Sequence, residues 1–132
     1  MNILITHYSK FNLFSIIYKN KYYQLINTKI HYIIDNVMRV LIKAFATLRE
    51  ILGSTGQIQL ELKDNINVNT LLNILAEKYG EQFTRYIFNE KGELNPFVKI
   101  FINGRNIEFL KGLETELKNG DVITLIPPVA GG

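Results

Sequence analysis

The sequence predicts an α+β domain in which one main helix packs across a single face of a four-stranded sheet. Three observations predict this fold class. Apolar and polar residues alternate, as in strands, in four segments: residues 39–45, 57–62, 97–103 and 121–126. Residues 67–80 repeat their apolar positions with a helical period instead. The resulting order along the chain is β-β-α-β-β.

The first two strands are predicted to form an antiparallel pair. In the first, Val40, Ile42 and Ala44 share one face, and in the second the apolar face carries Ile58, Leu60 and Leu62. The intervening stretch TLREILGSTG indicates a short helical link and then a glycine-containing connection.

The helix is predicted from a one-sided apolar stripe bounded by two terminal signals. Asn67 is a suitable N-cap and Gly80 a suitable stop. The apolar period resumes after Gly80, which predicts a further short helical segment. The stripe consists of Val68, Leu71, Leu72, Leu75, Ala76 and Tyr79. The apolar positions that continue it after Gly80 are Phe83, Tyr86 and Ile87.

The last two strands are separated by a turn and an irregular connector. The residues NGR after position 102 suit the turn, and FLKGLETELKNGD predicts a connector with Leu110, Leu113 and Leu117 pointing inward. The final strand, DVITLI, runs directly into PPVAGG.

The amino-acid composition changes sharply at Met38. Residues 1–37 contain four lysines and one aspartate, so the formal charge of +3 belongs to this segment, and all glycines and prolines lie after it. A folded domain needs such turn residues. We therefore predict that residues 1–37 are a poorly structured extension, or upstream sequence ahead of a native start at Met38, and that residues 38–132 form the domain.

The extension carries no sign of a membrane or nucleic-acid partner. Its most apolar stretch, FNLFSIIY, is eight residues long, whereas about 20 are needed to span a bilayer. Its lysines are too dispersed to form a basic patch, and no signal-peptide cleavage pattern is present. We expect a cytoplasmic protein.

The composition also argues against catalysis by internal side chains. The chain has no cysteine, and neither His7 nor His31 has a metal-ligand spacing. No carboxylate pair, histidine dyad or glycine-rich phosphate loop is placed where chemistry could use it, and NGRN and GSTG are typical of turns. We predict no metal site, no cofactor bound by the chain itself, and no enzyme activity of the chain alone.

Three segments resemble one known family. MRVLIKAFATLREILG, NVNTLLNILAEKYG and the ending FINGRNI…LKNGDVITLIPPVAGG are similar to the small sulfur-carrier subunit of molybdopterin synthase, of the MoaD/ThiS type. The likeness covers Met38 to Gly132. It implies the ubiquitin-like β-grasp fold with a mixed sheet. An aspartate is common in the family where this chain has Asn119, and nothing in residues 1–37 matches.

The resemblance implies that the chemistry takes place at the carboxylate of Gly132. A ubiquitin-activating-like enzyme would adenylate it with ATP and Mg²⁺, and sulfur would then displace AMP to leave a thiocarboxylate. The large catalytic subunit of molybdopterin synthase would use that sulfur to form the pterin dithiolene. Two alternatives remain open: a ubiquitin-like modifier joined to lysines through Gly132, and a sulfur carrier for thiamine or tRNA thiolation.

The tail is expected to enter both partners' active sites as a thin arm. Pro127 and Pro128 lack an N–H donor and have a fixed φ, so they should end the strand ladder and project the chain stiffly. Gly131 and Gly132 have no Cβ and can pass a narrow channel. The predicted insertion segment ahead of Gly132 is Pro127, Pro128, Val129, Ala130 and Gly131.

Docking is expected to use the sheet face turned away from the helix. Aromatic side chains on a small domain often mark an interface, although some can pack under connectors instead. The aromatic candidates are Phe45, Phe97 and Phe101; the charged candidates, which could equally be solvated surface groups, are Arg39, Lys43, Lys99 and Arg105.

Overall fold

The chain divides into two compact units, Met1–Asn36 and Val37–Gly132. The computed structural model describes residues 21–128, without the side chains of residues 33–35. The predicted boundary after residue 37 falls one residue from the division between the units.

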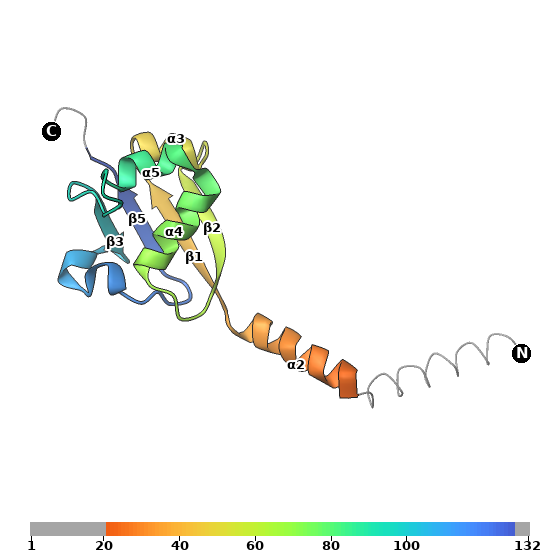
Figure 1. The fold of residues 1–132 in the computed structure, drawn as a ribbon. Helices are drawn as coiled ribbons and strands as arrows, with labels where there is room; N and C mark the ends of the chain where they lie inside the picture. Colours follow the sequence, from red (N-terminus) through yellow and green to blue (C-terminus); the bar gives the residue numbers. More distant parts are fainter. Residues whose placement is uncertain (1–20, 129–132) are drawn as a thin grey trace, which may run out of the picture. The chain divides into compact units, whose positions relative to one another are not determined.

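Within the first unit, helix α2 spans Lys21–Asp35 (Figure 1). We expected little structure in this part of the chain. The segment contains no glycine or proline to interrupt a helix, and Leu25, Ile26 and Ile30 recur at a helical spacing, although each is exposed. Among the described residues, no helix is both long and apolar enough to cross a bilayer.

The second unit is built on a mixed sheet with the strand order β2-β1-β5-β3-β4. The strands are β1 (Val37–Ala44), β2 (Gln57–Lys63), β3 (Lys99–Ile102), β4 (Arg105–Asn106) and β5 (Val122–Ile126). β1 and β5 run parallel at the centre, and the other pairs are antiparallel. The predicted α+β class and mixed sheet are confirmed.

The predicted count of four strands is wrong because β4 is a fifth. β4 pairs Arg105 with Ile102 and Asn106 with Phe101. Asn103 and Gly104 form the connecting turn with φ values of 51° and 84°, the left-handed conformation that tight hairpins use. A strand of two residues has no alternation to reveal it in a sequence.

The third strand is shorter than the segment 97–103 that the alternation predicts. The side-chain oxygen of Asn95 accepts a hydrogen bond from the Phe97 N–H at 2.9 Å, and its carbonyl accepts one from Val98 N–H at 3.0 Å. These bonds hold Phe97 in a turn, so pairing begins only at Lys99.

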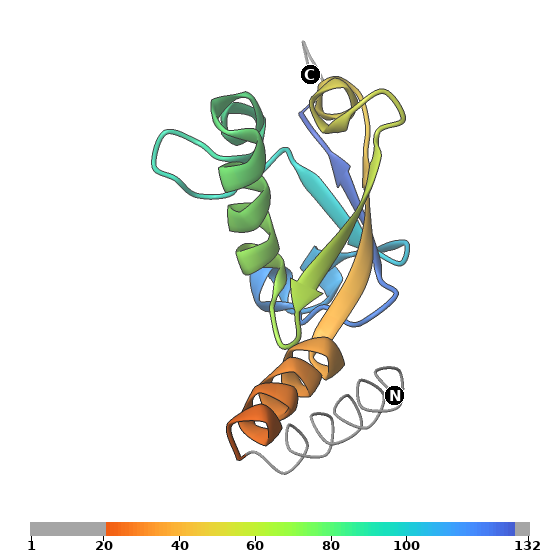
Figure 2. The same cartoon turned by 90° about the vertical axis from the view of Figure 1, so that its right-hand side faces the viewer.

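Helices cover one face of the sheet (Figure 2). They are α3 (Thr47–Leu52), α4 (Val68–Tyr79) and α5 (Glu81–Ile87), with two 3₁₀ turns, Ile107–Phe109 and Gly112–Glu114, in the last connector. The predicted caps of α4 are confirmed. Asn67 accepts a hydrogen bond from Thr70 N–H at 2.9 Å, and Gly80, with φ 69°, ends the helix.

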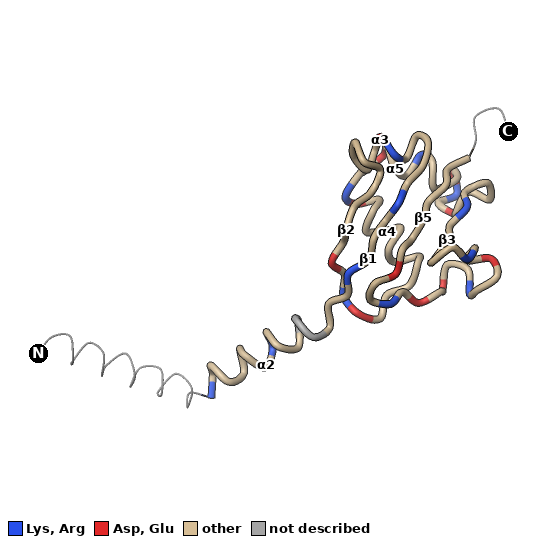
Figure 3. The backbone as a smooth tube through the Cα atoms, turned by 180° about the vertical axis from the view of Figure 1, so that it is seen from behind, with Lys and Arg blue, Asp and Glu red and all other residues tan. Residues whose placement is uncertain are grey.

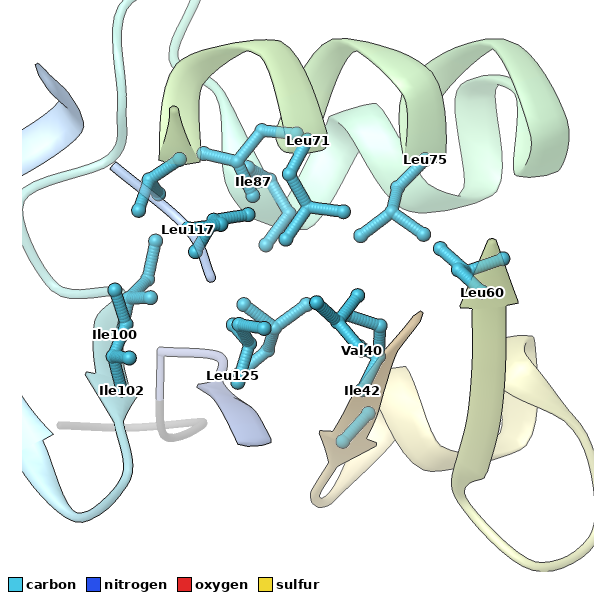
Figure 4. Packing of buried hydrophobic residues seen from close by; sticks show 14 of the residues in the cluster. Val40, Ile42, Leu60, Leu71, Leu75, Ile87, Ile100, Ile102, Leu117 and Leu125 are labelled. Carbon is cyan, nitrogen blue, oxygen red and sulfur yellow. The ribbon is translucent and has the colours of Figure 1, made fainter. Parts of the chain in front are cut away.

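The core lies between the sheet and α4 (Figure 4). Val40 and Ile42 of β1 and Leu71 and Leu75 of α4 all belong to this cluster, and all four side chains are buried. The alternation therefore predicted the correct inner face of β1. Leu117 is also buried, and Leu110 and Leu113 are partly buried against the core, which confirms the inward direction predicted for the connector leucines.

We predict that a chain beginning at Met38 unfolds with the same free energy as the full chain, within about 0.5 kcal/mol. The reason is that every buried apolar side chain of the described residues lies at Met38 or later. Urea denaturation of both chains tests this. As a control, a chain beginning at Val40 lacks the buried Met38 and should be less stable. Loss of cooperative unfolding in the Met38 chain would contradict the prediction.

Candidate functional site

The predicted insertion segment follows β5, the central strand of the sheet. β5 lies between β1 and β3 and is tied to β1 along its whole length. The Leu41 N–H donates to the Asp121 carbonyl at 3.0 Å, and the Phe45 N–H donates to the Leu125 carbonyl at 3.2 Å. The position at which the chain leaves the sheet is therefore fixed by strands on both sides.

The start of β5 is held by a polar clamp that the sequence analysis missed. Asp121 is buried, and its two carboxylate oxygens accept hydrogen bonds from Asn103 Nδ2 at 2.9 Å and from the Lys118 N–H at 2.8 Å. Asn103 Oδ1 in turn accepts from the Val122 N–H at 2.9 Å. The two turns NGR and NGD are thus joined to each other, so their role is structural.

We expect Asp121→Ala to lower the free energy of unfolding by about 1–3 kcal/mol, because it removes two part-buried hydrogen bonds to a charged acceptor. Chemical denaturation measures the loss. The exposed Glu93→Ala serves as a control and should change stability by less than about 0.5 kcal/mol. A neutral effect of the Asp121 change would show that the clamp does not stabilise β5.

The predicted free arm begins later than expected. The strand ladder ends at Ile126, which pairs with Lys99, as the missing N–H of proline requires. Pro127, however, is buried, and Pro128 is half-buried. The first proline is therefore an anchor on the domain rather than part of a projecting arm. Val129, Ala130, Gly131 and Gly132 lie outside the described residues.

The three aromatic candidates differ in exposure. Phe97 is 70% exposed and Phe45 is 50% exposed, so both can contact a partner. Phe101 is only half-buried in the sheet face. Phe45 follows the end of β1, and Phe97 lies two residues before the start of β3. Phe101 lies within β3 and pairs with Asn106 of β4.

The charged candidates do not form one patch. Figure 3 views the sheet from the side opposite α4, with lysine and arginine in blue. Arg39 lies 3.1 Å from Glu61, and Lys99 lies 3.2 Å from Glu108. Lys43 is half-buried and Arg105 is exposed. Because Arg39 and Lys99 already have acidic partners within the domain, they gain little from a second one.

Two hollows lie on the described surface of the domain. The larger, about 640 Å³, lies over α4, α5 and the loop at residues 89–92, and a smaller one of about 240 Å³ lies between α3 and α5. Neither lining contains a histidine, a serine or a lysine. Burial raises the pKa of the Tyr79 phenol, but this side chain lines neither hollow. Among residues 21–128, no cluster of acidic or histidine side chains could hold a metal ion.

Known proteins resemble this chain in both sequence and structure. A profile of the ThiS family matches residues 42–132. A candidate sulfur carrier protein of Archaeoglobus fulgidus is 41% identical over 81 residues, which are 61% of this chain and 91% of that protein. Small archaeal modifier protein 3 of Haloferax volcanii is 37% identical over 95 residues, 72% of this chain and 100% of that protein.

Solved structures share the fold. Small archaeal modifier protein 1 of Methanosarcina acetivorans is 38% identical, with a TM-score of 0.58 over 73% of this chain and 98% of its own. A candidate subunit 1 of the molybdopterin converting factor of Pyrococcus furiosus is 28% identical, with a TM-score of 0.54 over 70% and 99%. The BexX/CysO complex of Amycolatopsis orientalis also matches at 28% identity, with a TM-score of 0.52 over 70% and 99%.

The matched region begins within β1, runs to the end of the tail and leaves out residues 1–41. The strand order and the single helical layer found here agree with the ubiquitin-like β-grasp fold of these relatives. The chain therefore belongs to the ThiS family of small ubiquitin-like sulfur carriers and modifiers.

Proposed function

We propose that this protein is a sulfur carrier whose Gly132 carboxylate, at the end of the mature chain, is converted to a thiocarboxylate. The observation that carries the proposal is the fixed exit of β5 into a tail without reactive side chains, in a chain that has no cysteine. Such a chain cannot hold sulfur on a thiol. The match to the ThiS family, which extends to residue 132, supports the acyl carbon of Gly132 as the position of the sulfur.

The proposed chemistry has two steps. A carboxylate oxygen of Gly132 attacks the α-phosphorus of ATP, pyrophosphate leaves, and an acyl-adenylate forms. A hydrosulfide equivalent then attacks the acyl carbon and AMP leaves, so that a C–S bond replaces a C–O bond. A separate ubiquitin-activating-like enzyme supplies the ATP site and Mg²⁺. The present chain supplies the acyl group and the surface that positions it.

We further propose that the sulfur is used to form the molybdopterin dithiolene on the large catalytic subunit of a molybdopterin synthase. The likeness to a candidate molybdopterin converting factor subunit and the ending PPVAGG support this acceptor. The domain would act as a non-catalytic subunit, and the larger partner would supply the acid–base groups. A cytoplasmic location is part of the same proposal.

A second candidate function is a protein modifier joined to lysines through Gly132. It is favoured by the 37–38% identity to two small archaeal modifier proteins. Both functions begin with the same acyl-adenylate. They differ in the nucleophile that follows, which is sulfur in the first and a lysine amine in the second.

Intact-mass analysis of the protein isolated from its own cells tests these proposals. A carrier shows a mass increase equal to sulfur replacing oxygen, located at Gly132 by fragmentation, and co-purifies with a pterin-synthase subunit. A modifier instead leaves Gly-Gly remnants on lysines of other proteins. A mature chain that extends beyond Gly132 would contradict both.

A further inference from the structure

We propose that Pro127 is a positioning residue of the adenylation step. Its buried ring fixes the point of the domain from which the tail extends, and it thereby sets how far the Gly132 carboxylate reaches toward ATP. The inference rests on the proposed function and adds to it the residue that determines the reach of the reacting group.

The burial of Pro127 continues the pattern of β5 beyond the end of the strand. The inward side chains of the strand, Ile123 and Leu125, have no exposed surface, and the residues between and beside them are half-buried. Pro127 is the next residue in this phase and is also buried, whereas Pro128 is half-buried again. Since the strand itself ends at Ile126, the alternation of burial runs one residue past the last pair of the ladder.

The ring of Pro127, and not its backbone, must hold this position. Backbone pairing holds the chain as far as Ile126, which pairs with Lys99. On the other side of β5, the Phe45 N–H donates to the Leu125 carbonyl at 3.2 Å. Proline has no N–H, so Pro127 cannot donate the next hydrogen bond of the ladder. Its attachment to the domain therefore depends on the burial of its apolar ring.

This attachment determines the reach of the reacting carboxylate. Five residues, 128–132, follow Pro127, and five residues span at most about 16–18 Å when fully extended. A chain released at position 127 would gain about 3.5 Å of reach and the conformational freedom of one more residue. Both changes disturb the alignment of the carboxylate with the α-phosphorus of ATP. They do not alter the surface of the domain, so we expect the effect on kcat and not on KM.

Pyrophosphate exchange catalysed by the adenylating enzyme of the same genome, with the full-length chain as substrate, tests the proposal. We expect Pro127→Gly to lower kcat by about tenfold while the KM for the chain changes by less than about twofold. Pro127→Val, which keeps an apolar side chain at the buried position, should restore most of kcat. A merely structural role would instead reduce the folded fraction of the substrate, which raises the apparent KM and leaves kcat unchanged.

A shortened tail provides a second test, in which the same substitution has the opposite effect. Deleting Val129 draws the Gly132 carboxylate back by about 3.5 Å, and it should lower kcat more than about 100-fold. Adding Pro127→Gly to this deletion should raise kcat again by about tenfold, because position 127 can then leave the domain and supply the missing reach. If Pro127 only stabilised the fold, the double variant would be less active than the deletion alone.

Denaturation curves measure the folded fraction of each variant under the assay conditions. If Pro127→Gly is unfolded there, Pro127→Ala, which also removes most of the ring, replaces it with the same expected results. A normal kcat for the folded single variant, or a double variant less active than the deletion alone, overturns the inference. Failure of the unaltered chain to be adenylated at all overturns the proposed function itself, and the two failures are therefore distinguishable.

Discussion

Deleting Gly132, or adding one residue after it, is expected to abolish ATP-dependent activation while the free energy of unfolding stays unchanged. Either change moves the terminal carboxylate by about 3.5 Å along the channel. A displacement of about 1 Å can already cost 100-fold in rate when reacting atoms must be aligned. Because Pro127 is buried, the length of the free tail is fixed, and the domain cannot compensate for the change.

Pyrophosphate exchange measures this loss, and Ala130→Gly provides a control that keeps the tail length. That variant should retain activity because it removes only one methyl group from the arm. Stability should be equal in all variants, since the affected residues lie beyond the last strand, which ends at Ile126. Full activity of the shortened or the lengthened chain would show that the reacting group lies elsewhere.

Phe83→Ala is expected to lower the free energy of unfolding by about 3–5 kcal/mol. Phe83 is the largest fully buried side chain, with no exposed surface, and its ring centroid lies 6.3 Å from that of Tyr79. Removing the ring leaves a cavity between α4 and α5 that the sheet cannot close. Domains of this kind have a total stability of about 5–15 kcal/mol, so much of it would be lost.

Guanidinium denaturation at equilibrium measures this effect as a shift of the midpoint at a constant slope. Phe97→Ala removes the same ring from a position that is 70% exposed, and it should change stability by no more than about 0.5 kcal/mol. Equal decreases in the free energy of unfolding for the two variants would mean that burial does not determine how much a phenylalanine ring stabilises this domain.

The sequence predicted those features of the fold that depend on near neighbours. The alternation of Val40, Ile42 and Ala44 identified the inner face of β1 because side chains on a strand point alternately to its two faces. The Asn67 cap and the Gly80 stop located α4 to the residue because both signals act within one turn. Because proline has no N–H, Pro127 correctly predicted that the backbone hydrogen bonds of β5 end at Ile126.

Features that join distant residues could not be predicted in this way. Asp121 bonds to Asn103 across 18 positions, and Asn119 accepts from the Arg39 N–H across 80 positions at 2.8 Å. Asn103, Asn119 and Asp121 each look like ordinary turn formers in the sequence. The burial of Pro127 is likewise a result of the packing around it, so a local pattern predicted a free arm where the structure has an anchor.

The parallel pairing of β1 with β5 also bears on how the protein is made. Leu41 meets Val122 at the middle of the sheet, so the two innermost strands come from opposite ends of the domain. During synthesis the β1–β2 hairpin can form early, but the ribosome must deliver roughly 60 further residues after Lys63 before β5 is complete, and such distant pairing is slow. We therefore expect a nascent chain that stalls before residue 122 to lack the strand that joins β1 to β3, so its sheet stays incomplete.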